Sequence, residues 1–90
     1  MHIQNADRAV LQTDGIVRRV DPVGRELEVA VAGTPVNFDV RTDCAITLRG
    51  ERVKLRLLQP RDRVRISYAW VEGVRVAGAV DVQPGEQPTS

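Results

Sequence analysis

Apolar residues occupy every second position along several short segments of this chain, and this alternation is what most restricts its possible folds. The period of two is clearest in residues 26–31, 36–40 and 63–71, and residues 74–82 continue it as a partner segment. Such a period is that of a β-strand with one buried and one exposed face. Because valine dominates the apolar positions, and β-branched residues favour strands, the pattern predicts an all-β protein.

Turn-forming residues separate these segments. "DPVG" at 21–24 has proline in the second position of a β-turn, Gly-Thr at 33–34 turns the chain back, and Glu-Gly at 72–73 predicts a tight turn. Residues 15–40 therefore predict a three-stranded meander, and residues 63–82 predict a hairpin.

The chain between these two units loses the clear alternation. We expect Ile46 and Leu48, within 41–50, to cover one end of the core from a loop. Residues 51–60 fit either a short strand or a turn of helix that Pro60 would end. The strand would bury Val53, Leu55 and Leu57, whereas the helix would pair Leu55 with Leu58. In the following stretch, "LLQPRDRVRI", we expect the core residues to be Leu57, Leu58, Val64 and Ile66.

A chain of 90 residues has room for one domain with a thin core. Closing the strands on themselves removes exposed sheet edges, so we predict a small closed or partly open β-barrel of five to six strands over residues 13–83. Gly15, at the start of the first strand, and Gly78 would supply the sharp bends. Residues 1–12 are expected to be a tail or half-strand, and residues 84–90 a disordered tail.

The order of core and turn positions resembles a family of small bacterial β-barrel domains of unknown function. The segments that carry the resemblance are "GIVRRVDPVGRELEV", "TPVNFDVRTDCAI", "LLQPRDRVRI" and "VRVAGAVDV", which together cover about residues 14–82. The resemblance implies an OB-like barrel and says little about function. Arg61 stands where those domains have a glycine before Asp62, which argues against a positive φ at this position or for another turn type.

The scaffold is also similar to that of the periplasmic barrels that carry copper and silver, whose soft ligands are methionines and a histidine beside a tryptophan. Here the soft or borderline ligands are Met1, His2 and Cys44, and they are not clustered in the sequence. A Cu(I) or Zn(II) site needs several converging ligands. We therefore predict no metal site and no cofactor.

Catalytic patterns are missing from the sequence. It has no internal histidine, no Cys/His pair and no glycine-rich phosphate loop, so we expect a protein that is not an enzyme. Cys44, the single cysteine, is expected to be a small, partly buried residue. No apolar run approaches a membrane span, and the first residues do not follow a signal-peptide pattern. The expected location is cytoplasmic by default, with a trimmed exported protein left open.

A net charge of +1 conceals a basic segment, because residues 51–75 carry a net charge of +4. OB-like barrels often bind single strands through a basic groove with stacking aromatic rings. One hypothesis is therefore single-stranded nucleic-acid binding through Arg52, Lys54, Arg56, Arg63, Arg65 and Arg75. If residues 52–56 are extended, their three cations share one face. Arg63 or Arg65 would otherwise pair with Asp81 or a nearby acid on a solvated strand face.

The favoured hypothesis is a protein-interaction or scaffold module. Phe38 alternates with valines and is expected in the core, so it would not be a stacking ring. Tyr68 and Trp70 continue the apolar face of their strand and are expected in the core or at its rim. Alternatively, Trp70 and Val71 at the end of the hairpin form an exposed apolar patch for a protein partner.

Overall fold

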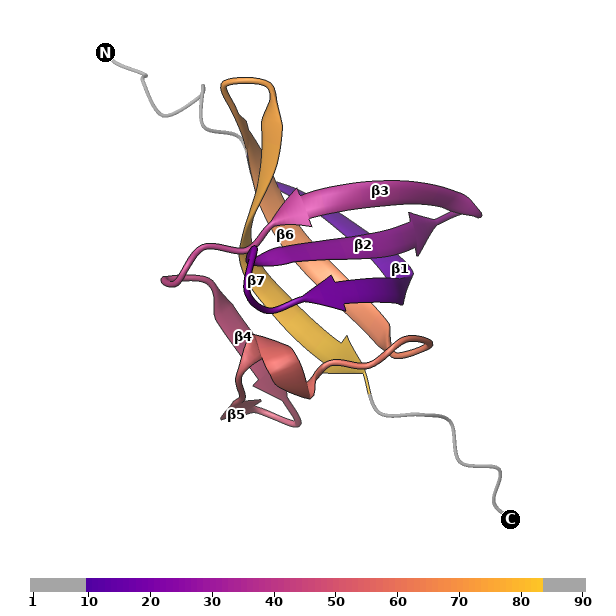
Figure 1. The fold of residues 1–90 in the computed structure, drawn as a ribbon, viewed down its shortest axis with the longest axis vertical. Coiled ribbons are helices and arrows are strands. Elements are labelled where there is room, and N and C mark those ends of the chain that lie inside the picture. Colours follow the sequence, from indigo (N-terminus) through magenta and orange to yellow (C-terminus); the bar gives the residue numbers. More distant parts are fainter. Residues whose placement is uncertain (1–9, 84–90) are drawn as a thin grey trace.

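Five strands close into a barrel in this protein, and two further strands extend it (Figure 1). The computed structural model describes residues 10–83, which contain no α-helix, and within this range no helix is long and apolar enough to cross a membrane. The elements are β1 (Leu11–Asp21), β2 (Glu26–Val31), β3 (Thr34–Asp39), β4 (Ala45–Leu48), β5 (Glu51–Arg52), the 3₁₀ turn η2 (Leu55–Leu57), β6 (Arg63–Val71) and β7 (Val74–Gln83).

The strand order gives the barrel its OB-like topology. Neighbouring strands run β3-β2-β1-β6-β7, and Asp39 of β3 pairs in parallel with Val76 of β7 to close the ring. Strand β4 then adds in parallel to the other half of β7, and β5 pairs with β4. The predicted all-β barrel of five to six strands is confirmed, with a five-stranded ring and two added strands.

Strand β1 is shared by the two halves of the barrel. Leu11–Ile16 pair with β6, whereas Ile16–Asp21 pair with β2. The strand therefore begins before Gly15, where the sequence placed its start, because pairing with β6 holds the polar residues Gln12–Asp14 in extended form. Leu11 and Gln12 belong to β1 and not to a tail. The expected tail at 84–90 lies outside the described residues.

Gly15 is needed for close packing at the point where β1 changes partner. A Cβ atom there would overlap Cγ1 of Val29 and lie 2.6 Å from the main-chain oxygen of Ala30. Gly78 has a different role, since Ser67 faces Ala79 while Tyr68 faces Ala77, which leaves Gly78 as the extra residue of a β-bulge. A Cβ atom at Gly78 would have its nearest neighbour 3.9 Å away.

The bulge changes which residues of β7 face the core. Sequence alternation put Val74, Val76, Val80 and Val82 on one face, but only Val80 and Val82 are buried. Before the bulge the buried residue is Ala77, and Val74 is exposed. One extra residue reverses the alternation, which is why the predicted face fails at the start of β7.

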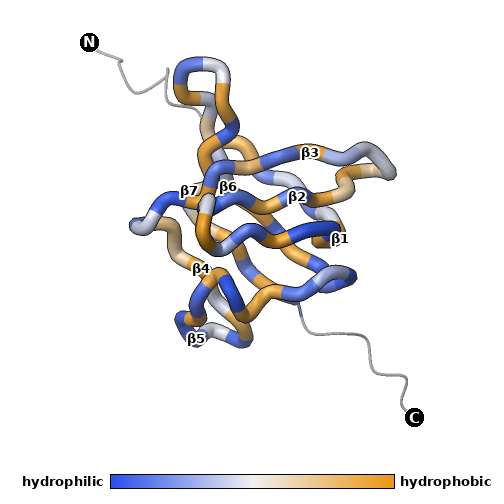
Figure 2. The backbone as a smooth tube through the Cα atoms, in the orientation of Figure 1, coloured by the Kyte–Doolittle hydropathy of each residue, from blue (hydrophilic) through white to orange (hydrophobic). Residues whose placement is uncertain are grey.

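The core fills the barrel with the alternating residues of its strands, and Figure 2 shows hydrophobic and hydrophilic positions following one another along them. The predicted burial of Phe38 and Cys44 is confirmed. The buried set is Val17, Leu27, Val29, Phe38, Val40, Cys44, Ile46, Leu55, Leu58, Val64, Ile66, Ala77, Val80 and Val82.

The connection between the two units differs in part from the prediction. Ile46 is buried as expected, but it lies on strand β4 rather than in a loop, because β7 offers it a parallel neighbour. Residues 51–60 form both predicted alternatives in turn, the short strand β5 and the 3₁₀ turn η2. The i to i+3 spacing of η2 buries Leu55 and Leu58 and leaves Leu57 48% exposed, so its predicted place in the core is wrong.

The turns use positive φ angles more often than the sequence suggested. The β2–β3 turn is centred on Ala32 (φ 52°) and Gly33 (φ 83°), one residue earlier than predicted. Glu72 (φ 52°) and Gly73 (φ 81°) have similar angles, so both turns fit type I′ hairpins.

The turn before β6 also has a positive φ. Arg61 has φ 84° and follows Pro60, while the amide of Asp62 donates to the oxygen of Gln59, as in a type II turn. Of the two expectations for Arg61, the one without a positive φ is therefore wrong.

We expect Gly15→Ala to lower the free energy of unfolding by about 1–3 kcal/mol, because its Cβ has no space beside Val29 and Ala30. Gly78→Ala is the matched control and should stay within about 0.5 kcal/mol of the wild type, since the space beside it is open. Urea denaturation of the two variants measures the difference. Equal stability of both would show that β1 does not depend on this close approach.

We expect Arg61→Gly to raise the free energy of unfolding by about 0.5–1 kcal/mol, because a left-handed φ costs a residue with a Cβ more than it costs glycine. Arg61→Ala removes the same charge but keeps the Cβ, so it should give no gain. Thermal unfolding of both variants compares them. A gain of equal size in both would assign the effect to charge rather than to the backbone.

Candidate functional site

The end of the β6–β7 hairpin projects beyond the rest of the barrel (Figure 1). In the part of the chain that the structure describes, β1 reaches β6 only as far as Tyr68, and β3 meets β7 only at Val76. Among residues 10–83, Trp70, Val71, Val74 and Arg75 therefore pair only with each other, and Ala69 pairs with Val76. We call residues 69–76 the arm.

Apolar side chains cover much of the arm. Cross-strand pairs join Ala69 to Val76, Trp70 to Arg75 and Val71 to Val74. Because side chains alternate, Trp70 and Arg75 share one face, and the alanine and the valines share the other. Trp70 is 51% exposed, Val71 38% and Val74 46%. Of the places expected for Trp70 from the sequence, this exposure excludes the core and is consistent with the rim of the core or an exposed patch.

The tryptophan ring is exposed but held in place. The guanidinium carbon of Arg75 lies 4.4 Å from the ring centroid of Trp70, a cation–π contact worth about 0.5–1 kcal/mol at an exposed site. Tyr68 meets Trp70 edge to face at 6.5 Å and Phe38 of the core at 5.2 Å. A chain of rings therefore connects the arm to the barrel interior.

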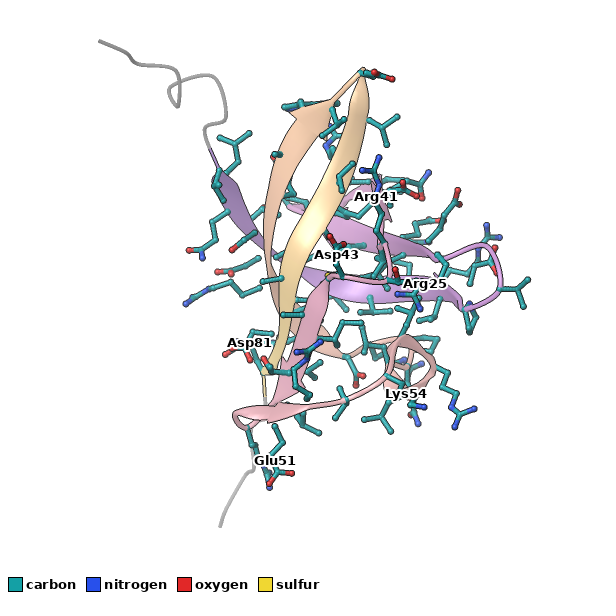
Figure 3. All side chains as sticks on the ribbon, turned by 90° about the vertical axis from the view of Figure 1, so that its left-hand side faces the viewer. Arg25, Arg41, Asp43, Glu51, Lys54 and Asp81 are labelled. Carbon is teal, nitrogen blue, oxygen red and sulfur yellow. The ribbon has the colours of Figure 1, made fainter. Side chains whose placement is uncertain are left out.

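A shallow hollow lies at the base of the arm. It has a volume of about 460 Å³ and is lined by Val71, Val76 and Gly78 of the arm and bulge, with Arg41 and Asp43 from the β3–β4 connection. Its floor is the apolar face that carries Val71. The apolar face of the arm thus continues as a shallow depression towards Arg41 and Asp43, which Figure 3 labels.

The predicted basic residues do not form one surface. Arg65 is engaged by acids on both sides, since its Nε donates to Oδ1 of Asp14 at 2.9 Å and Asp81 is its cross-strand neighbour on β7. The expected pairing with a nearby acid is thus observed with Asp14. The hydrogen bond from Arg65 holds the pKa of Asp14 below its ordinary value, and the same bond raises the pKa of Arg65.

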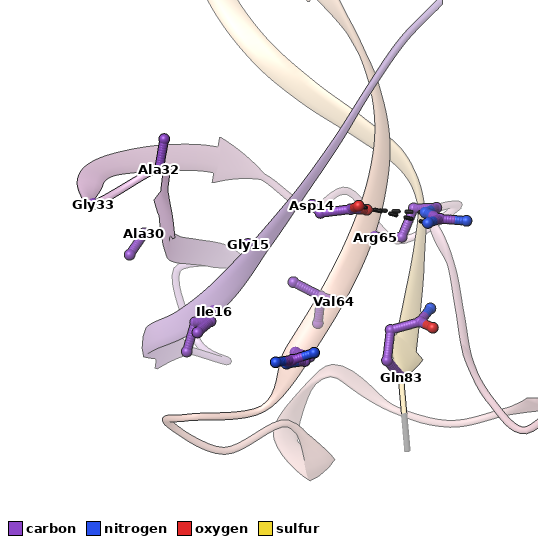
Figure 4. A pocket seen from close by; sticks show the side chains of 10 residues that line it. Asp14, Gly15, Ile16, Ala30, Ala32, Gly33, Val64, Arg65 and Gln83 are labelled. Carbon is purple, nitrogen blue, oxygen red and sulfur yellow. Dashed lines mark hydrogen bonds and ion pairs between the residues drawn. The ribbon is translucent and has the colours of Figure 1, made fainter. Parts of the chain in front are cut away.

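Arg63 and Arg65 both line a groove of about 770 Å³. Figure 4 shows this groove with Arg65 labelled. The groove crosses from Gln83 of β7 over Ile16 of β1 to Ala30 and Gly33 at the β2–β3 turn. Among residues 10–83, Arg63 has no carboxylate within ion-pair distance.

The remaining cations lie elsewhere. Residues 52–56 are not extended as a whole, so Arg52, Lys54 and Arg56 do not share the predicted face. Lys54 and Arg56 instead flank a small hollow beside the exposed Leu57. Figures 1 and 3 place the region around Lys54 at one end of the barrel. Arg75 belongs to the arm, which lies at the opposite end.

Acidic residues occupy the surface that OB folds commonly use for oligonucleotides, the outer face of the second and third strands. Asp21, Glu26 and Asp39 are direct cross-strand neighbours on β1, β2 and β3. Arg41 pairs with Asp39 at 3.7 Å, and Arg18 pairs with Glu28 at 3.8 Å. Glu26 and Glu28 share the outer side of β2, so this face carries carboxylates where a phosphate chain would lie.

Two residues of interest were missed in the sequence. Alternation placed Val74 on the same strand face as Val80 and Val82, although a glycine inside a strand, here Gly78, often marks a bulge that changes the face. Asp14 was not predicted as a site residue, because its partner Arg65 is remote in sequence and only the strand register brings the two together.

Comparison with known proteins gives the fold and no family. The chain matches no protein-family model and no curated protein sequence. It does match solved structures of CusF from Escherichia coli. The silver-bound form covers 90% of this chain and all of its own, with a TM-score of 0.69, and the apo form covers 93% and 99%, with a TM-score of 0.68.

The chain shares its fold with CusF. The sequence identity is 12% in both comparisons, so the similarity to CusF concerns the scaffold alone. Residues 10–83 contain no group of three or more His, Cys, Asp or Glu side chains that could hold a metal ion. Met1 and His2 lie outside these residues. The similarity to CusF therefore adds no ligand to the surfaces described above.

Cys44 should react slowly in the folded protein. Burial raises the pKa of its thiol to about 11, and the thiolate is the reactive form. At pH 8 we expect alkylation by iodoacetamide to be about 100-fold slower than for the same chain unfolded in guanidinium chloride, as followed by mass spectrometry. Rapid alkylation of the folded chain would contradict the burial of this residue.

Proposed function

We propose that this protein is a non-enzymatic protein-binding module and that the arm is its contact surface. The observation that supports this most directly is the exposure of Trp70 on one face of the arm and of Val71 and Val74 on the other, outside the barrel. A tryptophan beside an arginine is also the composition most enriched among the residues that dominate binding energy at protein interfaces.

The energetics of the arm support the same proposal. A two-stranded ribbon is only marginally stable in water, and apolar side chains on it gain little from folding alone. The barrel core is closed by strands below the arm and includes none of Trp70, Val71 or Val74. Burial against a partner would give these side chains the stabilisation that the barrel does not provide. The ring contacts with Tyr68 and Arg75 reduce the conformational entropy lost on binding.

Single-stranded nucleic-acid binding is the alternative function. The OB-like topology and the Arg63 side chain, which has no ion-pair partner within residues 10–83, support it. Arg65 would have to leave Asp14 to contact a phosphate. Among residues 10–83, no aromatic side chain on which a base could stack lines the groove beside Arg63. The cations also lie at both ends of the barrel, so a short strand would contact few of them.

We expect a photo-crosslinking amino acid at position 71 to capture a discrete protein partner in cells that express the chain natively. The same amino acid at position 23 is the control, because Val23 is 93% exposed but lies on the β1–β2 turn, away from the arm. Adding Trp70→Ala should reduce the crosslink at position 71 at least tenfold, since interface tryptophans contribute about 2 kcal/mol or more. The Trp70→Ala substitution itself should lower the free energy of unfolding by only about 1 kcal/mol.

Equal labelling from positions 71 and 23, or a crosslink that is unchanged by Trp70→Ala, would contradict the proposed surface. Anisotropy titrations with labelled single-stranded DNA and RNA test the alternative in parallel. Binding that is lost in Arg63→Ala, with a salt slope of about −0.7 per contacted phosphate, would favour the nucleic-acid function.

A further inference from the structure

The first half of β1 has a strand neighbour on one side only. Within residues 10–83, β2 pairs with β1 from Ile16 onwards, so Leu11–Gly15 meet β6 and no strand on the opposite edge. The main-chain amide and oxygen of Val17 bond towards the β6 side, to Asp62 and Arg61. Because these directions alternate along a strand, the N–H and C=O groups of Gln12 and Asp14 point to the open edge.

The groove of about 770 Å³ provides room beside this edge. It lies where β2 leaves β1, between Asp14 and Gly15 on one side and the β2–β3 turn with Ala32 and Gly33 on the other (Figure 4). Small residues on the turn side leave space for another main chain. An edge with free hydrogen-bonding groups and space beside it is the geometry in which an added strand binds.

The charge at the open edge indicates what the added strand would carry. Asp14 of β1 pairs with Arg65 of β6, which in turn faces Asp81 of β7. Thr47 of β4 follows, with its hydroxyl donating to Asp81 at 2.9 Å, and Arg52 of β5 ends the row. In this cross-strand row the charges alternate, and its open end is the 68% exposed carboxylate of Asp14. A direct cross-strand neighbour of opposite charge stabilises a sheet, so the next position favours lysine or arginine.

We propose that a partner protein inserts an extended peptide along the open edge of β1, with a lysine or arginine directly opposite Asp14. The main-chain groups of Gln12 and Asp14 hold the peptide, and Asp14 selects its charge. Near the β2–β3 turn the peptide lies against Ile16, a partly exposed apolar residue of the groove, so a small or apolar side chain fits there. This site is separate from the arm and does not depend on it.

Two synthetic peptides test the proposal with the full chain. One is acetyl-Thr-Val-Thr-Lys-Thr-Val-Thr-amide, and the other has glutamate in place of lysine. We expect the lysine peptide to bind about fivefold more tightly, in line with direct cross-strand charge pairs. Amide NMR signals of Gln12 and Asp14 should shift, and their hydrogen exchange should slow. Asp14→Asn should abolish or reverse the preference, because it removes the carboxylate and frees Arg65.

Control variants separate this site from the rest of the surface. Asp43→Asn changes an exposed acid at the base of the arm and should leave the preference unchanged. Gln12→Pro removes an edge N–H and no main-chain bond to β6, although it also removes the 3.3 Å side-chain hydrogen bond from Gln12 to Ser67. It should weaken both peptides, provided that thermal unfolding shows an intact fold. Trp70→Ala should have no effect, so failure of the arm proposal would leave this result standing.

Three results would overturn the proposal. One is the absence of binding by either peptide up to low millimolar concentration. Another is equal affinity for the two peptides, which would remove the role of Asp14. The third is a set of shifts confined to residues 69–76, which would place the peptides on the arm instead.

Discussion

The close approach of β1 to β2 at Gly15 is the contact on which the barrel depends. One strand must pair with β6 over its first half and with β2 over its second, and the exchange takes place where Val29 and the oxygen of Ala30 leave no space for a side chain. Without this strand, the pair β2–β3 would meet the hairpin β6–β7 through the short pairing of Asp39 with Val76 and would leave two open edges among the described residues. Their shared core, from Leu27 and Val29 to Ile66 and Val80, exists because β1 belongs to both.

The same stagger explains why both candidate binding surfaces lie where they do. Since β1 changes partner halfway along, its first half is left with an open edge beside the β2–β3 turn. Since β1 and β3 stop short of the hairpin end, β6 and β7 continue beyond them as the arm. In a barrel this small the interior is filled by its own side chains, so binding uses the outer surface. The open edge of β1 offers main-chain groups there, and the arm offers apolar side chains.

The features that the sequence predicted are those that depend on local patterns. Alternation predicted the strands and the burial of Phe38, Val64 and Ile66, because one face of each of those strands meets the core. The features that it missed depend on distant partners. The strand around Ile46 needs β7 beside it, and the reversal of faces at Gly78 appears only when β6 supplies a register. The turn at Arg61 is held by main-chain bonds to Val17, so a residue with a Cβ can keep the angle that glycine would favour.

The arginines illustrate the difference between charge in a sequence and charge on a surface. Residues 51–75 carry a net charge of +4, yet strands and a 3₁₀ turn distribute their cations over both ends of the barrel. Register then sets an acid beside Arg65 and an aromatic ring beneath Arg75. Arg65 and Arg75 are thus each occupied by a neighbour that only the folded sheet provides, and the other cations of this segment are divided between the two ends of the barrel. The two proposed binding surfaces therefore rely on open main-chain groups and a few fixed side chains rather than on a continuous basic face, because strand register sets opposite charges beside one another.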